Sequence, residues 1–281
     1  MIRTDQLDPA AQFRRLHERD GAFVIPNPWD IGSARILAAM GFEALATTSA
    51  GMAFALGRPE GQCFQDDVLA HCRMIAGATS LPVSADLEKG FGDSPDAVAE
   101  TIHLAAKTGL AGCSIEDHTG RKDDPIFPFD FAVERISAAS EACRALDHDF
   151  VLTARAENFL WDRPDLDDTM ARLNAFEQAG ADVLYAPGLH DLETIRTVCS
   201  ALSKPVNVIM GMPGVSFCVA ELEEAGVKRI SIGSALARAA FGAVLKASAE
   251  MAKKGTFTFA HDAAGFKELD DLFSTFVAKR F

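Results

Sequence analysis

Four segments of the chain repeat one pattern, in which an alanine-rich helix ends at a glycine and an apolar strand follows. The glycines are Gly41, Gly109, Gly180 and Gly226, and each suits the left-handed position that closes a helix. Apolar runs entered through other sequences alternate with these four strands. The pattern predicts eight strands, near 22–26, 44–48, 82–86, 112–115, 151–154, 183–186, 205–209 and 229–232.

Helical patterns separate the strands, and two of them begin after the good N-cap residues Asp30 and Ser94. Near-continuous apolar strands joined by helices are typical of a parallel sheet, and eight such units close into a barrel. An open doubly wound sheet usually has a glycine-rich turn after its first strand, and Asn27-Pro28-Trp29-Asp30 is no such turn. The predicted fold class is therefore α/β, a (β/α)8 TIM barrel in one domain over residues 1–281. The predicted helices cover 31–40, 66–79, 94–108, 130–146, 166–179, 190–201, 215–225 and 234–253.

Residues 254–281 are one helix more than a barrel needs, and we expect them to form a C-terminal helical extension. The apolar face of this helix, predicted near 261–279, must be buried on the barrel or on a neighbouring subunit. That face comprises Phe266, Leu269, Leu272, Phe273, Phe276 and Val277.

Composition narrows the possible partners and the compartment. The formal net charge of -13 argues against nucleic acid and against anionic membranes as partners. The six cysteines form no C-x-x-C pair and are expected to be reduced thiols. No segment approaches the roughly 18 apolar residues of a membrane span, and the N-terminus lacks the apolar core of a signal peptide. A cytoplasmic location is expected.

Polar side chains gather where the predicted strands end. Asp86 and Glu88 follow a buried strand two residues apart, so they point the same way. Glu116 and Arg155 end two later strands, and in such barrels the active site lies at these ends. Carboxylates without a His or Cys set suit Mg²⁺ or Mn²⁺, with one acid as the direct ligand and the others holding its waters. Other polar strand-end residues are Asn27, Asp30, Asp117, Glu157, Asn207 and Ser231.

Structural interpretations of the same residues stay open. Arg155 could form an ion pair with Glu116 or Glu157, and Asp86 could cap a helix or loop. Glu60 lies in a sequence typical of an exposed turn. The long polar loop 117–129 is a candidate lid, in which His118 and Lys122 could be simple loop residues. Glycines at 211–214 and 232–235 are similar to a barrel phosphate site, which leaves a phosphate-ester aldolase as a further hypothesis.

Five motifs taken together resemble the isocitrate lyase/phosphoenolpyruvate mutase superfamily over roughly residues 20–245. The resemblance implies that Asp86 binds Mg²⁺ directly and that Glu88 and Glu116 hold metal-bound waters. It also implies that Arg155 binds the carboxylate side of the substrate. The motifs are Asn27-Pro-Trp-Asp-Ile-Gly-Ser-Ala-Arg35, Thr47-Thr-Ser-Ala-Gly51, Val83-Ser-Ala-Asp-Leu-Glu-Lys-Gly-Phe-Gly92, Ser114-Ile-Glu-Asp117 and Thr153-Ala-Arg155.

The same resemblance implies further residues and an assembly. Backbone and hydroxyl groups of Ser49, Ala50 and Gly51 are expected to bind the 2-oxo-carboxylate, and Glu60 matches a loop position that is aspartate in well-known members. Arg155, Glu60 and Glu116 are the candidate catalytic residues. A homotetramer that exchanges its last helices between subunits is expected, which would bury the apolar face of the extension.

Two departures point to an unassigned branch on the phosphonomutase and oxaloacetate decarboxylase side of the superfamily. Isocitrate and methylisocitrate lyases carry a lid cysteine, whereas this chain reads Gly120-Arg-Lys-Asp-Asp124. They also have a glutamate after strand 6, where this chain has Pro187-Gly188. The expected function is a Mg²⁺-dependent lyase that cleaves the C–C bond next to a 2-oxo acid through a metal-stabilised enolate. Its substrate would be a small oxaloacetate-like or alkylmalate/isocitrate-like carboxylate.

Two other functions remain as alternatives. One is a P–C bond enzyme, either a phosphoenolpyruvate phosphonomutase or a phosphonopyruvate hydrolase. The other is a barrel that binds an oxo acid without turning it over.

Overall fold

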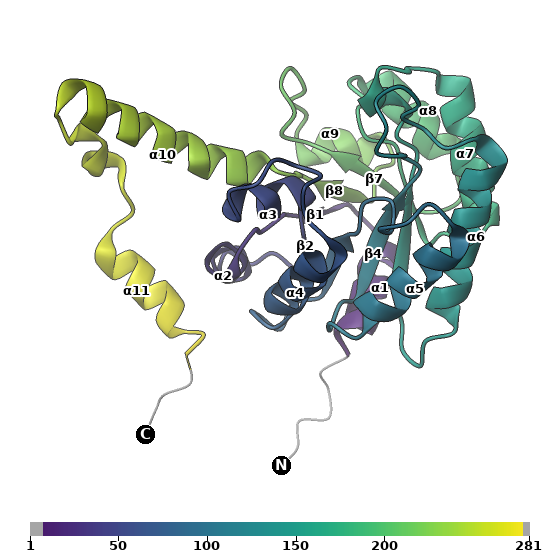
Figure 1. The fold of residues 1–281 in the computed structure, drawn as a ribbon, viewed down its shortest axis with the longest axis horizontal. Helices are drawn as coiled ribbons and strands as arrows, with labels where there is room; N and C mark the ends of the chain where they lie inside the picture. Colours follow the sequence, from purple (N-terminus) through teal and green to yellow (C-terminus); the bar gives the residue numbers. More distant parts are fainter. Residues whose placement is uncertain (1–7, 278–281) are drawn as a thin grey trace, which may run out of the picture.

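The computed structural model describes residues 8–277, in which eight parallel strands form a nearly closed barrel (Figure 1). The sheet order is β1-β8-β7-β6-β5-β4-β3-β2, and the amide of Ala46 donates to the carbonyl oxygen of Pro26 at 3.0 Å across the remaining seam. The predicted TIM barrel is confirmed. The strands are β1 Phe23–Ile25, β2 Leu45–Ala46, β3 Val83–Asp86, β4 Gly112–Glu116, β5 Val151–Arg155, β6 Val183–Tyr185, β7 Val206–Ile209 and β8 Arg229–Ser231.

Capping residues visible in the sequence begin and end several of the helices between the strands. Asp30 accepts a hydrogen bond from the amide of Ser33 at 2.7 Å, and Ser94 caps the next predicted start in the same way. All four repeat glycines have positive φ, from +86° to +101°. The barrel helices are α2 Ile31–Ala39, α4 Gln65–Ala76, α5 Pro95–Ala106, α6 Phe129–Arg144, α7 Leu166–Gln178, α8 Leu192–Ala201, α9 Val219–Glu224 and α10 Ala235–Lys254.

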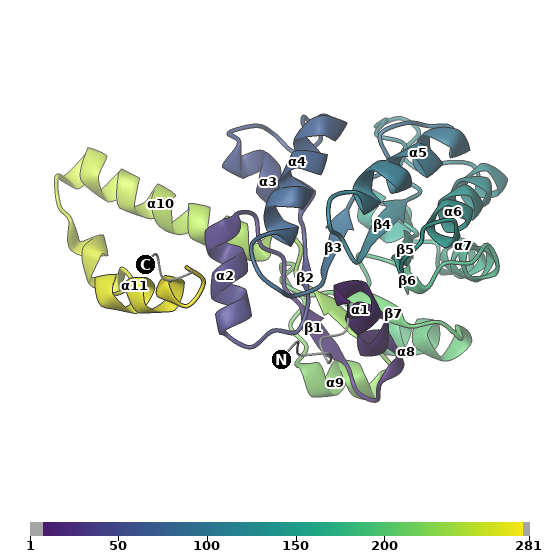
Figure 2. The ribbon, with the colours of Figure 1, turned by 90° about the horizontal axis from the view of Figure 1, so that it is seen from below.

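Two helices lie outside the predicted set, one at each end of the barrel. Helix α1, Pro9–Glu18, crosses the N-terminal ends of the strands (Figure 2). Its Phe13 and Leu16 pack with Phe23, Val151 and other residues from the strand starts, and so seal the bottom of the barrel. Helix α3, Ser49–Ala55, begins directly after β2 at the opposite end. Two short 3-10 helices, η1 Asn158–Trp161 and η2 Thr258–Asp262, complete the set.

The strand register brings the predicted site residues to one end. Asp86 is level with Ser114, and Glu116 with Arg155, across neighbouring strands. Side chains alternate along a strand, so residues two apart share the barrel interior. The same register places Thr153 level with Ser114, inside the barrel and below Arg155.

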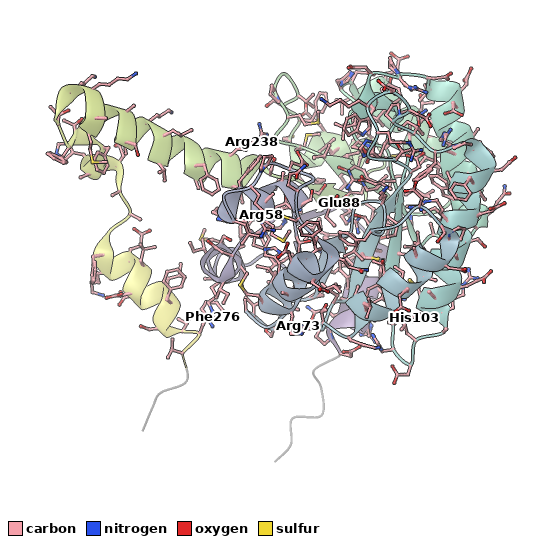
Figure 3. All side chains as sticks on the ribbon, in the orientation of Figure 1. Arg58, Arg73, Glu88, His103, Arg238 and Phe276 are labelled. Carbon is pink, nitrogen blue, oxygen red and sulfur yellow. The ribbon has the colours of Figure 1, made fainter. Side chains whose placement is uncertain are left out.

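The C-terminal segment leaves the barrel. Helix α10 projects outward, and α11, Phe266–Ser274, returns beside α2, where Arg35 lies over the Phe276 ring at 5.5 Å (Figures 1 and 3). The prediction of one helix over 261–279 was wrong in extent, since η2 and a break at 263–265 precede α11, and 278–281 lie outside the described residues. Many of its apolar side chains are exposed, among them Leu245 (71%) and Phe266 (84%). The boundary of the extension at 254 stays a prediction.

No helix between residues 8 and 277 combines the length and the apolar character needed to cross a membrane. The cytoplasmic location stays a prediction.

Candidate active site

A cavity of about 340 Å³ opens at the C-terminal ends of the strands. Ser49, Ala50 and all four predicted acids line it with Arg155, as do parts of the loops at 210–212 and 232–234. Gly51 does not line it, because it is buried inside α3, where its amide donates to Thr48 Oγ1 at 3.2 Å. The structure thus gathers at one cavity nearly all the residues that the sequence singled out.

Asp86 ends β3 and is held at both carboxylate oxygens. The amide of Ser49 donates to Oδ2 and that of Glu88 to Oδ1, each at 3.3 Å, while Arg155 Nη1 lies 3.1 Å from Oδ1. Glu88 itself has φ +50°, a left-handed conformation that is strained for a residue with a long side chain. With this left-handed turn, Glu88 lines the cavity together with Asp86.

Arg135 of α6 holds this strained loop from outside. Its guanidinium donates to the carbonyl oxygen of Gly92 at 2.9 Å, and also to those of Lys89 and Asp93. Its charge lies over the Phe127 ring, 4.3 Å from the centroid. Burial lowers the pKa of Arg135 to about 10, so the side chain stays charged at neutral pH. The loop that presents Asp86 and Glu88 is therefore held by a buried cation in addition to its own contacts, such as the hydrogen bond from the Gly90 amide to the carbonyl oxygen of Leu87 at 2.9 Å.

Arg155 lies among three carboxylates. Its Nη2 is 2.7 Å from Glu157 Oε1, and its Nη1 is 3.1 Å from Asp86 Oδ1 and 3.3 Å from Glu116 Oε2. The guanidinium also lies over the Tyr185 ring, 5.1 Å from its centroid. Arg155 thus forms the ion pairs that the structural interpretation expected, with Glu116 and with Glu157. A role toward a ligand stays a prediction.

The crowded carboxylates resist ionisation. Burial, followed by the negative charges of Asp86, Glu116 and Glu60, raises the pKa of Glu88 to about 7. Burial, followed by the charges of Asp86 and Glu116, also raises the pKa of Glu60, although its turn is exposed. Burial also raises the pKa of Glu157 against the opposing charge of Arg155. The single positive charge of Arg155 does not neutralise the carboxylates at this end of the cavity.

The donor set suits a hard cation. Repulsion among ionised oxygens is what a divalent cation relieves, and oxygen donors suit Mg²⁺ or Mn²⁺. Within residues 8–277, however, no three His, Cys, Asp or Glu side chains are grouped closely enough to bind one ion together. The residues therefore fit an ion held by one carboxylate and by waters, and Asp86 lies at the centre of the cluster.

The loop after β4 folds over one side of the cavity. His118 pairs with Ile126 in an antiparallel bridge, and its ring stacks on Trp161 of η1 with 3.9 Å between centroids. His118 Nδ1 lies 3.5 Å from Glu116 Oε1, and this loop residue lines the cavity. Lys122 is exposed, as expected for a solvated lysine.

Tyr185 of β6 and Arg229 of β8 are among the cavity residues that were absent from the sequence-based set. Arg229 precedes Ser231 by two positions on one strand, and Tyr185 is level with Arg155 and Asn207 on the neighbouring strands. That period of two was the available signal. It was weak, because an arginine within an apolar strand is more often exposed at an edge.

Fold and site together define an acid-lined (β/α)8-barrel protein with one arginine among its strand-end carboxylates. The chain belongs to the phosphoenolpyruvate phosphomutase family, whose model matches residues 13–252, and so to the isocitrate lyase/phosphoenolpyruvate mutase superfamily. The superfamily predicted from the five motifs is confirmed.

Similar proteins of known sequence or structure include lyases and mutases. The 2-methylisocitrate lyase of Escherichia coli K12 is 31% identical over 206 residues, which cover 70% of this chain and 68% of that enzyme. A solved 2,3-dimethylmalate lyase is 30% identical with a TM-score of 0.85 and 96% of each chain covered. A protein from Burkholderia cenocepacia J2315, described only as a lyase/mutase, is 56% identical with a TM-score of 0.92 and 95% of each chain covered.

Proposed function

We propose that this protein is a Mg²⁺-dependent lyase that cleaves the C–C bond next to a 2-oxo acid, leaving an enolate. The observation that supports this most is the cavity itself, where Asp86, Glu88 and Glu116 crowd around Arg155. A solved oxaloacetate acetylhydrolase, in complex with the product oxalate, is 27% identical to this chain with a TM-score of 0.85 and covers 94% of it. The proposal that the substrate is a small 2-oxo acid is taken from such relatives.

The chain's own residues bind and orient the substrate. At the first turn of α3, Ser49 offers its hydroxyl and Ala50 its backbone amide to the 2-oxo-carboxylate, since the Ser49 amide already donates to Asp86. Asp86 holds the cation, while Glu88 and Glu116 hold its waters. When bound, the cation supplies positive charge to the oxo oxygen as negative charge develops there. Arg155 supplies a second positive charge at the same end.

Glu60 and Glu157 have supporting roles in the proposal. Glu60 reaches the cavity from an exposed turn, so it can exchange protons with solvent as substrate binds. Glu157 is fully buried against Arg155 and fixes the direction of its guanidinium. Arg155, Glu60 and Glu116 remain the candidate catalytic residues.

A substrate panel tests the proposal. Oxaloacetate, alkylated oxaloacetates, methylisocitrate and phosphonopyruvate would each be incubated with and without Mg²⁺, with pyruvate, oxalate and phosphate measured as products. Mg²⁺-dependent C–C cleavage that disappears in Asp86→Asn supports the lyase. Conversion of phosphonopyruvate to phosphoenolpyruvate, or its hydrolysis to pyruvate and phosphate, with no C–C cleavage of the other substrates, would instead identify the P–C enzyme. Tight oxalate binding with no turnover would identify a binding protein.

We also propose that the protein is a homotetramer in which the C-terminal helices are exchanged between subunits. The support is the number of apolar side chains left exposed on the extension, including Val244, Leu245 and Phe257. Sedimentation equilibrium of the full chain is expected to give four times the chain mass. A monomer at micromolar concentration would contradict the assembly.

A further inference from the structure

Arg229 lies deep in the barrel, below the residues discussed so far. It occupies β8 two positions before Ser231, and only 5% of its surface is exposed. The cavity nevertheless reaches it, since Arg229, Asn207 and Ser231 are among the lining residues. We call these three residues the floor of the cavity.

The contacts of Arg229 are all with neutral groups. Its Nε donates to Asn207 Oδ1 at 2.8 Å, and its Nη2 donates to Thr153 Oγ1 at 2.9 Å. Its Nη1 lies 3.4 Å from Nε2 of His17, whose Nδ1 is 2.9 Å from the carbonyl oxygen of Phe13. The carbonyl requires a proton on Nδ1, which leaves Nε2 as an acceptor. Burial lowers the pKa of His17 to about 3, so this ring is neutral.

The charge of Arg229 is therefore uncompensated. No carboxylate between residues 8 and 277 pairs with it, whereas Arg155 and Arg172 both pair with carboxylates. Of its five N–H bonds, these contacts use three, so one remains free on each terminal nitrogen. A buried charge without a counter-charge is costly, and arginine remains protonated even here.

Arg229 thus differs from Arg155, although both line one cavity. Arg155 already contacts three carboxylates, so its charge is satisfied before any ligand arrives. At the floor, only a ligand can bring the missing negative charge. A carboxylate fits two free N–H bonds on one planar guanidinium, which is the pairing that arginine favours.

The size of the cavity agrees with such a ligand. Its 340 Å³ corresponds to roughly eleven waters at about 30 Å³ each, enough for a diacid of about ten heavy atoms. One carboxylate would lie near Ser49 at the mouth and the other at the floor. Ile25 and Ala46 supply apolar walls between them.

We propose that the floor, through Arg229, is a binding subsite for a second carboxylate, so that the protein selects 2-oxo acids with two carboxylates. This inference rests on the proposed function for the position of the first carboxylate. Asn207 orients Arg229 from one side, and Ser231 Oγ accepts from Asn207 Nδ2 at 3.1 Å, which keeps the floor in place.

Calorimetry with unreactive probes tests the subsite. 2-Oxoglutarate and 2-oxoadipate would be compared, in Mg²⁺, with 2-oxopentanoate and 2-oxohexanoate, which replace the distal carboxylate by a methyl group. The wild type is expected to bind at least one diacid about 10- to 100-fold more tightly than its matched monoacid, as for hydrogen bonds to a charged group. Arg229→Met should remove this preference, and Arg229→Lys should keep part of it.

Two controls make the result specific. Arg238→Met removes an arginine that also lines the cavity but is exposed near its rim (Figure 3), and it should leave the preference unchanged. Oxalate is too short to span from mouth to floor, so its affinity should be equal in the wild type and in Arg229→Met. An equal loss of oxalate and diacid binding in that variant would overturn the subsite in favour of a structural role.

The remaining outcomes are also decisive. Equal affinities of the wild type for every diacid and its monoacid would overturn the subsite, even if Arg229→Met does not fold. A preference that survives in Arg229→Met would assign the second carboxylate to another residue. A clear diacid preference without Mg²⁺-dependent turnover would instead contradict the proposed lyase and leave the subsite standing.

Discussion

The mouth and the floor of the cavity carry opposite excess charge. At the mouth, the carboxylates of Asp86, Glu116 and Glu157 surround the single guanidinium of Arg155. At the floor, the guanidinium of Arg229 meets an amide, a hydroxyl and a neutral imidazole. The mouth is built from β3, β4 and β5 and the floor from β7 and β8, within one barrel.

This difference shows how one barrel can bind two kinds of charge. The mouth lies where strands give way to loops, so carboxylates from several loops can crowd together and attract a cation. The floor is enclosed by strands and by α1, where a charge has little access to bulk water and few possible partners. A ligand along the barrel axis would complete both ends.

The largest expected effect is at the mouth. Asp86→Asn keeps the shape of the side chain but removes the negative charge at the centre of the cluster. Turnover, measured as kcat/KM, is expected to fall about 10³-fold, the scale seen when a charge-stabilising group is removed from an active site. Asp93→Asn is the matched control, because Asp93 follows in the same loop and pairs with exposed Arg121. A change of less than tenfold in Asp86→Asn would contradict the role of the mouth as a cation site.

Arg135→Met tests whether the mouth depends on its outer clamp. The substitution removes three part-buried hydrogen bonds to the carbonyl oxygens of Lys89, Gly92 and Asp93, each contributing about 1 kcal/mol. The free energy of unfolding by urea is expected to fall by about 3 kcal/mol, and Mg²⁺-dependent oxalate binding should weaken with it. Unchanged stability would show that the strained loop supports itself.

Glu157→Gln sharpens the contrast between the two arginines. It removes the most buried partner of Arg155 and leaves the guanidinium to Asp86 and Glu116. We expect kcat/KM to fall about 10- to 100-fold, corresponding to a charged hydrogen bond, while the diacid preference is unchanged. Loss of that preference would mean that mouth and floor are not independent. Glu157→Asp, which keeps the charge, should recover part of the activity.

The smallest effect concerns the floor and pH. The folded-state pKa of His17, about 3, lies below its ordinary value of 6.5, so the folded state favours the neutral ring. Its contribution to stability is complete above pH 6.5 and is lost as the pH falls toward 3, by at most about 1.4 kcal/mol per pH unit. Between pH 6.5 and 5, urea unfolding of His17→Gln should therefore depend less on pH than that of the wild type. Parallel pH profiles would disprove a neutral, buried imidazole.

The sequence predicted the strands and the mouth because both follow from local patterns. Asp86, Glu88, Glu116 and Arg155 stand directly at strand ends, which meet at one edge of any parallel barrel. Helix α3 was missed because seven residues are too few for a helical period to be recognised. The floor was missed because Thr153, Asn207 and His17 approach Arg229 from distant segments.

Helix α10 begins at Ala235, next to the cavity-lining residue Ser234, and Arg238 in its first turns lines the cavity as well. A partner that packs on the projecting part of α10 would therefore also stabilise the side of the cavity that this helix forms. If that partner is a second copy of the chain, dilution would remove the partner by mass action and loosen this side of the cavity at the same time. Specific activity, and not only thermal stability, would then decline as the protein concentration falls.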